Sequence, residues 1–444
     1  MELKINGILI FSESDFNYLS GAIPSEFGNM VSIQKISITS NNFTGPLPET
    51  LAKLTTLKDF RISDNHFSGN IPDFIQNWTN LEKIVMLASG LEGPIPSGIS
   101  LLTNLSDLRI SDIKATGAAF PPLRNMTKMK TLVLRNCNIT GEIPSYLSDM
   151  AKLKTLDLSF NKLTGQIPNS FESLSMLKFM YLTGNTLSGS VPASWMLRNV
   201  GNIDLSYNNF TFETSDSSSC QWTNVNLFRS SSLGNNVAGF IPCSRSKCSS
   251  CSHSFHINCG GKEIIANRGT KYEDDSDSAG ASNYFLSREN WAFSTTGNFM
   301  DDHNDLDNFK ALAANTSRLL MKDSQLYTTA RLSPISLSYY GFCLINGNYT
   351  VNLHFSEIIF TNDNTFGSLG RRVFDIYIQG KLVLRDFNIV DEAGGAGKAV
   401  IKNFTAVVTD TTLEIRFHWA GRGTVGIPSR GIYGPLISAI SVDS

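Results

Sequence analysis

Residues 153–168, LKTLDLSFNKLTGQIP, decide the fold of the first half of this sequence. Leu156 and Leu158 alternate with polar residues, so both side chains lie on the same face of a short strand. Asn161 follows, where its amide can satisfy turn backbone groups that would otherwise be buried without partners. Gly165 and Pro168 then turn the chain back. The stretch therefore predicts one short strand and a return.

The same stretch recurs with a period of 24 residues. Eight glycines keep this period, at positions 21, 45, 69, 93, 117, 141, 165 and 189, and eight prolines follow them, at 24, 48, 72, 96, 121, 144, 168 and 192. Such a period predicts a solenoid, in which stacked units bury a continuous core and expose one concave sheet. Proline and glycine in every unit exclude a helical repeat.

The motif L-x-x-L-x-L-x-x-N-x-L, followed by L-x-G-x-I-P, resembles the plant-type leucine-rich repeat over residues 17–212. We call the asparagine of this motif, such as Asn161, the ladder asparagine. Two repeats have Ser89 and Ile113 in its place. In another departure, residues 118–122 (AAFPP) distort one return. We expect the stack to be kinked or bulged there. Cys137 occupies a third ladder position, and we expect it to be a buried structural thiol.

The start of the chain fits the repeat poorly. Ser12 and Ser14 stand where strand leucines are expected, and residues 1–11 show no secretion signal. We therefore expect residues 1–16 to be an atypical start, foreign to the repeat. Either earlier repeats and a signal are missing from this chain, or the product is not exported.

The third, fifth and seventh positions of the pattern face the concave side of the predicted sheet. Several are apolar or aromatic, and arginines flank them, which favours a face that holds a peptide or protein partner. The alternative is that isolated exposed apolar residues need no ligand. The candidate concave-face residues are Arg61, Val85, Leu87, Arg109, Val133, Arg135, Phe179 and Tyr181.

Composition excludes some classes of protein. With 37 Lys and Arg against 39 Asp and Glu, the formal charge is −2, which gives no electrostatic basis for binding nucleic acid or a polybasic attraction to membranes. No uncharged apolar run approaches the ~20 residues of a membrane helix. We expect no nucleic-acid partner and no membrane span in this chain.

Cysteines and sequons favour an oxidising, extracellular setting. Residues 213–253 are predicted to form a disulfide-tied cap and linker, and zinc is a weak alternative, so we predict no metal. The disulfide candidates, in fifteen possible pairings, are Cys220, Cys243, Cys248, Cys251, Cys259 and Cys343. The glycosylation candidates, in a number close to chance, are Asn42, Asn77, Asn104, Asn125, Asn138, Asn209, Asn315, Asn348 and Asn403.

Residues 254–441 change to period-two alternation, as in Val351, Leu353 and Phe355, which predicts an antiparallel sandwich. The motifs at 339–343 (YYGFC), 374–377 (FDIY) and 432–440 (IYGPLISAI) are similar to the malectin-like domain of plant receptor kinases. The order of the two regions resembles the ectodomain of plant leucine-rich-repeat receptor-like serine/threonine kinases. The fold class is therefore mainly β, a solenoid followed by a malectin-like sandwich.

The malectin resemblance implies a sugar site built from aromatic rings and one carboxylate. Matching motif by motif, the ring positions fall on Tyr327 and Phe360, with Tyr284 as a further candidate. A second family ring falls on Ile359 and the acid falls on Gly434, so two elements are absent. The alternative is that these rings are ordinary sandwich core.

No catalytic residue or cofactor is predicted. The kinase triplets HRD, DFG and APE are absent, and the glycine-rich segments 394–399 and 421–426 fit turns better than phosphate loops. The acidic segment 301–307 lacks the spacing of a calcium loop. We expect an extracellular recognition region that binds a peptide, glycan or co-receptor. The alternatives are an incomplete membrane receptor kinase and a carbohydrate-binding protein.

Overall fold

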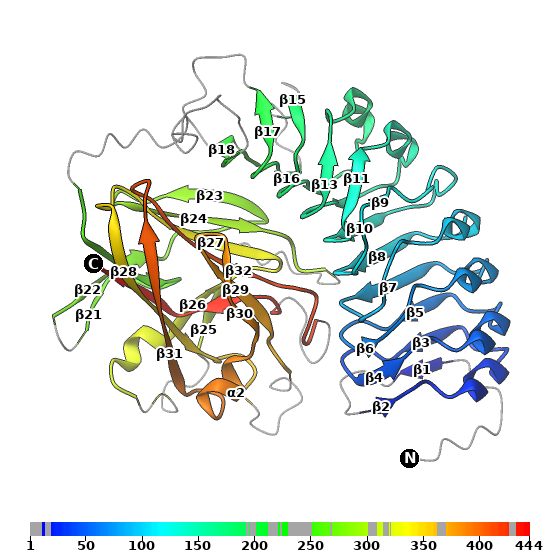
Figure 1. Cartoon of the computed structure of the whole chain (residues 1–444), viewed down its shortest axis with the longest axis horizontal. Helices are drawn as coiled ribbons and strands as arrows, with labels where there is room; N and C mark the ends of the chain where they lie inside the picture. The colour runs from blue at the N-terminus through cyan, green and yellow to red at the C-terminus, as the bar shows by residue number, and fades with distance from the viewer. Residues whose placement is uncertain are drawn as a thin grey trace. The chain divides into compact units, whose positions relative to one another are not determined.

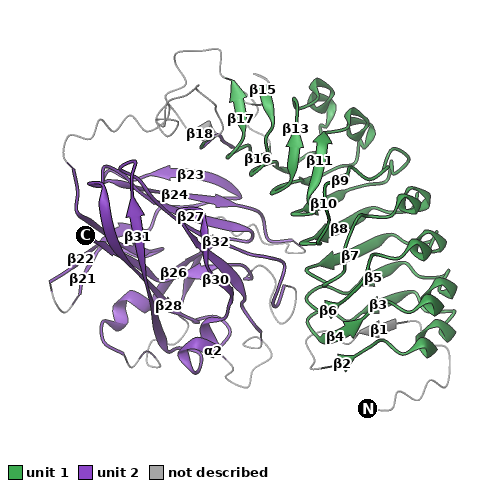
Figure 2. Ribbon diagram, viewed as in Figure 1, with its two compact units in different colours: residues 1–214, 229–232 green, residues 215–228, 233–444 purple. Residues whose placement is uncertain are grey.

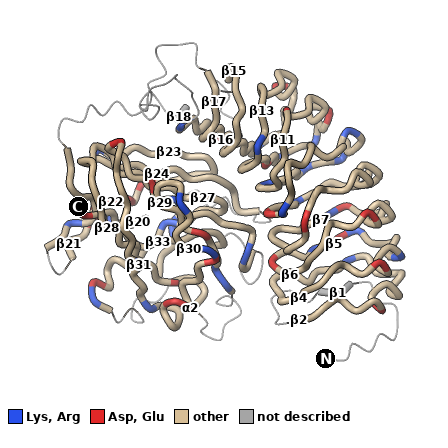
Figure 3. Tube along the Cα trace, viewed as in Figure 1, with Lys and Arg blue, Asp and Glu red and all other residues tan. Residues whose placement is uncertain are grey.

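The computed structural model describes residues 11–13, 19–191, 195, 201–211, 221–222, 224–229, 251–266, 269–300, 309–313, 319, 321–361, 370–425 and 432–444. The chain divides into two compact units (Figure 2). Unit 1 comprises residues 1–214 and 229–232, and unit 2 comprises residues 215–228 and 233–444. Along each unit, acidic and basic residues are interspersed (Figure 3).

Unit 1 is a stack of parallel strands, each one repeat further along the chain (Figure 1). Thr131 of one strand lies opposite Thr155 of the next, so the register steps by one sequence period. The predicted solenoid is confirmed. Its strands, in order, are β1 (Phe11–Glu13), β3 (Lys35–Ser37), β5 (Asp59–Arg61), β7 (Lys83–Leu87), β8 (Asp107–Ser111), β10 (Thr131–Arg135), β12 (Thr155–Asp157), β14 (Phe179–Tyr181) and β16 (Asn202–Asp204).

Strand β1 corrects the expectation for the start of the chain. Phe11 pairs with Lys35 and Glu13 pairs with Ser37, in parallel and with the register of the other repeats. Residues 11–13 therefore belong to the stack, although serine stands where a leucine was expected. Backbone pairing with β3 does not depend on that side chain, which is why the sequence pattern missed it.

The returns of unit 1 are short 3-10 helices that begin directly after the periodic prolines. Pro48, with φ −69°, precedes one such helix, and Leu51 within that helix is 1% exposed. The fixed φ of proline favours this start, and the helix buries one apolar side chain in the core. The helices are η1 (Ser25–Asn29), η2 (Glu49–Lys53), η3 (Asp73–Asn77), η4 (Ser97–Leu101), η5 (Ser145–Asp149) and η6 (Asn169–Ser173).

Short parallel strands accompany the returns, in three small sheets. The return that begins at residues 118–122 differs from the others, because it carries no such helix among the described residues. The accompanying strands are β2 (Ser20–Gly21), β4 (Asn42–Gly45), β6 (His66–Phe67), β9 (Ala118–Ala119), β11 (Ile139–Glu142), β13 (Lys162–Thr164), β15 (Ser188–Ser190) and β17 (Asn209–Thr211).

The ladder asparagines satisfy buried backbone groups, as predicted. Asn65 Nδ2 donates to the carbonyls of Ile38, Ile62 and Ser63 at 3.0–3.1 Å, and its Oδ1 accepts from the Phe43 amide at 3.1 Å. Repeats with a ladder asparagine have strands of three residues, as in β5 and β12. The repeats with Ser89, Ile113 and Cys137 have strands of five residues, β7, β8 and β10. Where the amide is missing, strand-to-strand pairing extends instead, as between Leu87 and Ser111.

Cys137 is a free thiol that is 0% exposed, as expected for a structural residue. Its Sγ lies 3.3 Å from the Arg135 carbonyl and 3.5 Å from the Ile110 carbonyl. Burial raises the pKa of the thiol well above its usual range, so the group stays neutral. The sulfur thus fills a ladder position that asparagine holds elsewhere.

Unit 2 consists mainly of two six-stranded sheets, in the orders β21-β22-β20-β34-β28-β31 and β23-β24-β27-β32-β29-β30. Most pairs are antiparallel, and β20 with β22 is a parallel exception. Phe355 of the first sheet packs on Phe374 and Phe417 of the second, with ring centroids 6.0–6.1 Å apart. The predicted sandwich is confirmed, and its core lies between the two sheets.

The strands of unit 2 are short, apart from β28 and β31. Their bounds are β18 (Gln221–Trp222), β19 (Val225–Asn226), β20 (Ser254–Cys259), β21 (Ile264–Ile265), β22 (Lys271–Asp275), β23 (Ser282–Leu286), β24 (Trp291–Thr296), β25 (Lys310–Leu312), β26 (Thr329–Leu332), β27 (Ser336–Gly341), β28 (Gly347–Ser356), β29 (Phe374–Ile378), β30 (Lys381–Phe387), β31 (Ala399–Val408), β32 (Leu413–His418), β33 (Leu436–Ile437) and β34 (Ala439–Asp443). Two helices, η8 (Ser324–Tyr327) and α2 (Ile389–Ala393), complete the described elements.

The cysteines of unit 2 only partly follow the disulfide prediction. Cys343 is disulfide-bonded, whereas Cys251 is free and exposed and Cys259 is free and buried. Cys259 ends β20 beside Asp275, and burial, with this neighbouring charge, raises the pKa of its thiol. Including these two residues among the bridged cysteines was therefore wrong. Cys220, Cys243 and Cys248 lie outside the described residues, as do Asn315 and the acidic segment 301–307.

Candidate functional site

Seven of the eight candidate concave-face residues lie in two continuous rows across the parallel sheet, and Phe179 lies outside them, opposite Thr155. The central row crosses six consecutive strands, because each residue lies opposite the next in register. A shorter second row joins Leu87, Ser111 and Arg135. The central row consists of Arg61, Val85, Arg109, Val133, Asp157 and Tyr181. Neighbouring positions are thus about 4.8 Å apart, the spacing of paired strands.

Most of these side chains are less exposed than expected. Val85, Leu87, Arg109, Val133, Arg135 and Tyr181 are all under a tenth exposed, whereas Arg61 and Phe179 are intermediate. Neighbours within the sheet contribute to this cover: the ring of Phe179 stacks on Tyr181 with centroids 6.3 Å apart. Among the apolar candidates, only Phe179 is partly exposed.

The arginines of the rows are held by carboxylates. Arg61 donates to both oxygens of Asp59, at 2.6–3.1 Å, and Arg109 donates to Asp107 at 2.7 Å in the same geometry. Lys83 also contacts Asp107, at 2.9 Å. These pairs fix the planes of the guanidinium groups. The face therefore presents oriented ion pairs rather than the cationic surface that the sequence suggested.

Two aspartates complete the rows and were missed by the sequence reasoning. Asp157 Oδ2 lies 3.3 Å from Arg135 Nη1, while its Oδ1 accepts from the Ser159 amide at 3.0 Å. Asp204 Oδ1 likewise accepts from the amide of Ser206 at 3.0 Å. The signal was present, because Asp-Leu-Ser occurs at the same repeat position in both strands. Each aspartate is thereby oriented by its own strand.

Described residues of unit 1 line a groove and a small internal hollow. A groove of about 680 Å³ opens beside the repeats that lack a ladder asparagine, lined in part by Asp112, Asn136 and Asn138. Burial raises the pKa of Asp112, whose carboxyl accepts from Ser111 Oγ at 2.6 Å and from Asn136 Nδ2 at 2.8 Å. The departures from the repeat thus coincide with a polar depression.

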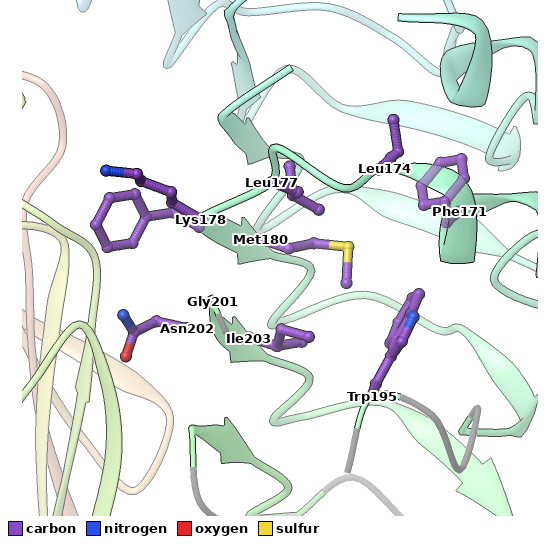
Figure 4. A pocket seen from close by; sticks show the side chains of 10 residues that line it. Phe171, Leu174, Leu177, Lys178, Met180, Trp195, Gly201, Asn202 and Ile203 are labelled. Atoms are coloured by element: carbon purple, nitrogen blue, oxygen red, sulfur yellow. The ribbon is translucent and has the colours of Figure 1, made fainter. Parts of the chain in front are cut away.

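The second hollow lies between β14 and β16, with a volume of about 20 Å³ (Figure 4). Met180, Ile203 and Trp195 point toward it, whereas Lys178 and Asn202 point away. A space of this size holds at most about one water molecule. It is a packing defect of the solenoid core and offers no ligand site.

The three carbohydrate candidates are packed in the interior of unit 2. Tyr327 is 3% exposed and shares a 3.0 Å hydrogen bond with His354 Nδ1, and burial raises the pKa of its phenol. Phe360 is 1% exposed beneath the Arg372 guanidinium. Tyr284 stacks on Phe228 at 4.5 Å. The structure brings no two of these rings into contact among the described residues, which favours the core interpretation.

The family acid position, Gly434, has a backbone role here. Its φ is +84°, and a Cβ at this position would lie 2.1 Å from the Ser333 carbonyl oxygen. Its own carbonyl accepts from Arg372 Nη1 at 2.6 Å, and Arg372 Nε donates to Glu357 Oε2 at 2.7 Å. A carboxylate side chain at 434 would thus require a backbone shift, which is a physical reason for its absence.

Comparisons identify the two regions. The Malectin domain family matches residues 253–440, and leucine-rich-repeat families match residues 32–54, 56–78 and 127–187. Two probable leucine-rich-repeat receptor-like serine/threonine-protein kinases of Arabidopsis thaliana are 52% and 53% identical over 255 and 256 residues. These alignments cover 54% and 56% of this chain but only 25% and 24% of the relatives. The chain thus spans about a quarter of the length of these relatives.

Among solved structures, the leucine-rich-repeat ectodomain of the plant membrane receptor kinase GASSHO1/SCHENGEN3 from Arabidopsis thaliana is similar, with a TM-score of 0.44 and 24% identity. That structure holds CASPARIAN STRIP INTEGRITY FACTOR 2, and the similarity covers 49% of this chain and 26% of that chain. Within the described residues, no helix is both long and apolar enough to cross a membrane. The chain carries leucine-rich repeats and a malectin domain and matches the leucine-rich-repeat and malectin ectodomain of plant receptor-like serine/threonine kinases.

Proposed function

We propose that this chain is an extracellular recognition region whose concave solenoid face binds a peptide or a protein partner such as a co-receptor. The observation that carries the proposal is the parallel register of the concave sheet, on which Arg61 and Phe179 are the partly exposed candidate residues. Arginine and tyrosine are enriched among residues that dominate protein interfaces. The Arg61-Asp59 pair and the ring of Phe179 would offer a partner one polar and one aromatic contact.

The distribution of sequons supports the same face. None of the nine sequon asparagines falls within the strands of the concave sheet, from β3 to β16. Because an N-linked oligosaccharide is bulky, a face without sequons is left open to a protein partner. The disulfide at Cys343 agrees with an oxidising, extracellular compartment.

Signalling is assigned to other segments of such receptors. The relatives are kinases, but the regions matched here are leucine-rich repeats and malectin, and the kinase triplets do not occur in these 444 residues. We therefore assign no phosphoryl transfer to this chain. Sugar binding through the malectin domain is the less favoured candidate, because its rings are buried and Gly434 has no side chain.

The test uses the half-buried members of the concave face. A displayed library of random peptides is selected on the secreted chain, and enriched peptides are measured on Arg61→Ala and Phe179→Ala. Each variant is expected to weaken binding about tenfold, a typical effect of removing one interface anchor. The matched controls, Lys152→Ala and the exposed Leu101→Ala, should bind as the unmodified chain does. Equal binding by all four variants would exclude the concave face.

A further inference from the structure

The edge of the first sheet of unit 2 is a long strand with one exposed side. Strand β31 spans Ala399–Val408; among the described strands it pairs with β28 alone and ends the sheet. An edge strand of this length presents unpaired backbone groups that can pair with another chain. Proteins usually block such an edge with charge, proline, a bulge or a cover.

The outward face of this edge is uncharged and partly apolar. Residues directly opposite in an antiparallel pair share a face, so the register places the side chains listed below together; His354, opposite Ile401, shares this face but is buried. Ile401 is 48% exposed and Val407 is 58% exposed, whereas Phe355 and Val351 on the other face are fully buried. The seven outward residues are Asn348, Thr350, Asn352, Ile401, Asn403, Thr405 and Val407. No lysine, arginine, carboxylate or proline lies on this face; the single charge of β31, Lys402, lies on the other face and pairs with Glu392 of α2.

Two sequons lie on this same face. Asn348-Tyr349-Thr350 is in β28, and Asn403-Phe404-Thr405 is in β31. Asn348 is opposite Val407, and Thr350 is opposite Thr405. Both asparagines and both threonines are exposed, because residues i and i+2 of a strand point the same way. No hydrogen bond holds the side-chain amide of either asparagine to the part of the chain that the structure describes.

Asn104 provides the contrast. Its Nδ2 donates to the Thr79 carbonyl at 3.0 Å, and its Oδ1 accepts from Lys128 Nζ at 2.7 Å. Asn138 Nδ2 donates to the Ala115 carbonyl. These two amides contribute to the fold of unit 1, whereas the amides of Asn348 and Asn403 point outward without such a role. Asn42, Asn77, Asn125 and Asn209 are exposed as well, but among the sequons that the structure describes only Asn348 and Asn403 lie on one face of an edge pair of strands.

We propose that Asn348 and Asn403 both carry N-linked oligosaccharides and that these cover the free edge of β31. The proposal rests on the extracellular placement proposed above. Sugars attached here would extend over Ile401 and Val407 and keep a second strand from approaching the edge. They would replace the charges that usually protect an edge strand.

The covalent step is a transfer from a lipid-diphosphate-linked oligosaccharide in the secretory pathway. The asparagine Nδ2 attacks the anomeric carbon, a C–N bond forms, and the C–O bond to the diphosphate breaks. The lipid diphosphate leaves with the bonding electrons, and Nδ2 loses one proton. Nothing is oxidised or reduced. The fold tolerates the product, because both side chains point to solvent.

The first measurement is a peptide map of the full chain, secreted from plant cells, after enzymatic sugar removal in heavy-oxygen water. Label is expected at both Asn348 and Asn403. Modification at other sequons but at neither of these would overturn the assignment of Asn348 and Asn403 and would leave the extracellular placement intact. A chain without label at any sequon would overturn the extracellular placement and the assignment with it.

The second measurement is the oligomeric state of the double variant Asn348→Gln/Asn403→Gln, by light scattering. A several-fold larger oligomeric fraction is expected, and adding Ile401→Thr and Val407→Thr should restore the monomer. Asn104→Gln, which removes a sequon elsewhere, should stay monomeric. If the double variant is not secreted, sugars are removed enzymatically from the folded chain instead. A monomer after either treatment overturns the protective role.

Discussion

The two units satisfy their buried polar groups in different ways. In the solenoid, a ladder asparagine repeats one local arrangement in successive repeats, as Asn65 and Asn161 show. In the sandwich, a few unique ion pairs join residues far apart in sequence, such as Arg331 with Asp275 and Arg372 with Glu357. A fault in a repeat should therefore stay local, whereas loss of one ion pair should affect the whole sandwich.

The largest expected effect is the loss of stability when the buried ion pair of unit 2 is broken. Arg331 and Asp275 are both 0% exposed, and Arg331 donates to both carboxylate oxygens at 2.7 Å. Arg331→Met leaves the carboxylate uncompensated and should lower the free energy of unfolding of this unit by about 3–5 kcal/mol. Urea denaturation measures this free energy of unfolding.

The matched control is Arg422→Met, because Arg422 pairs with Asp386 at 2.9 Å where both side chains are more than a third exposed. Removing an exposed pair should cost about 0–1 kcal/mol. Similar losses in the two variants would contradict the role assigned to burial.

The next largest expected effect is a pH dependence of the stability of the sandwich. Burial lowers the pKa of His354 to about 4, and its Nδ1 shares a 3.0 Å hydrogen bond with Tyr327 Oη. The unfolded chain takes up this proton near the usual pKa of about 6.5, so stability from this group is full above that pH. It should fall by up to about 3 kcal/mol as pH drops from about 6.5 to about 4, and then level off.

Urea denaturation of the chain and of His354→Gln at pH 7, 5.5 and 4 measures this dependence. The variant should have a flatter profile than the unmodified chain over this range. A parallel decline in both proteins would assign the dependence to other groups, such as His256, whose pKa burial also lowers.

The smallest expected effect is the loss of stability of unit 1 when one ladder asparagine is replaced. Asn65→Ala removes three donated hydrogen bonds and one accepted one, and should lower the stability of unit 1 by about 1–3 kcal/mol. Faster amide exchange is expected in the adjacent repeats, with little change beyond them. Asn80→Ala, which removes one exposed contact to the Thr55 carbonyl, serves as the control. Loosening throughout unit 1 would contradict local coupling.

The sequence predicts well what repeats and poorly what is unique. The period fixed the strands, the returns and the alignment of Val85, Arg109 and Val133, because each position is constrained by the same position one repeat away. It did not show that Asp59 and Asp107 hold the arginines, since a carboxylate two residues away has several rotamers.

In the sandwich, alternation predicted the strands but not the chemistry between them. The free thiol of Cys259, the burial of Tyr327 and the backbone role of Gly434 all depend on residues far away in sequence. A single sequence carries no signal for such contacts. The malectin resemblance therefore transferred the fold, while the family's ring and acid positions did not transfer as a binding site.

The register of the parallel sheet has a consequence for how such arrays change in length. Each repeat bonds only to its neighbours, at a step of one period, as between Thr131 and Thr155. Duplication or loss of a gene segment that encodes one whole period would preserve the register step at every remaining junction. The solenoid can thus gain or lose whole repeats by unequal recombination. A sandwich cannot change in this way, because each of its strands has a unique partner.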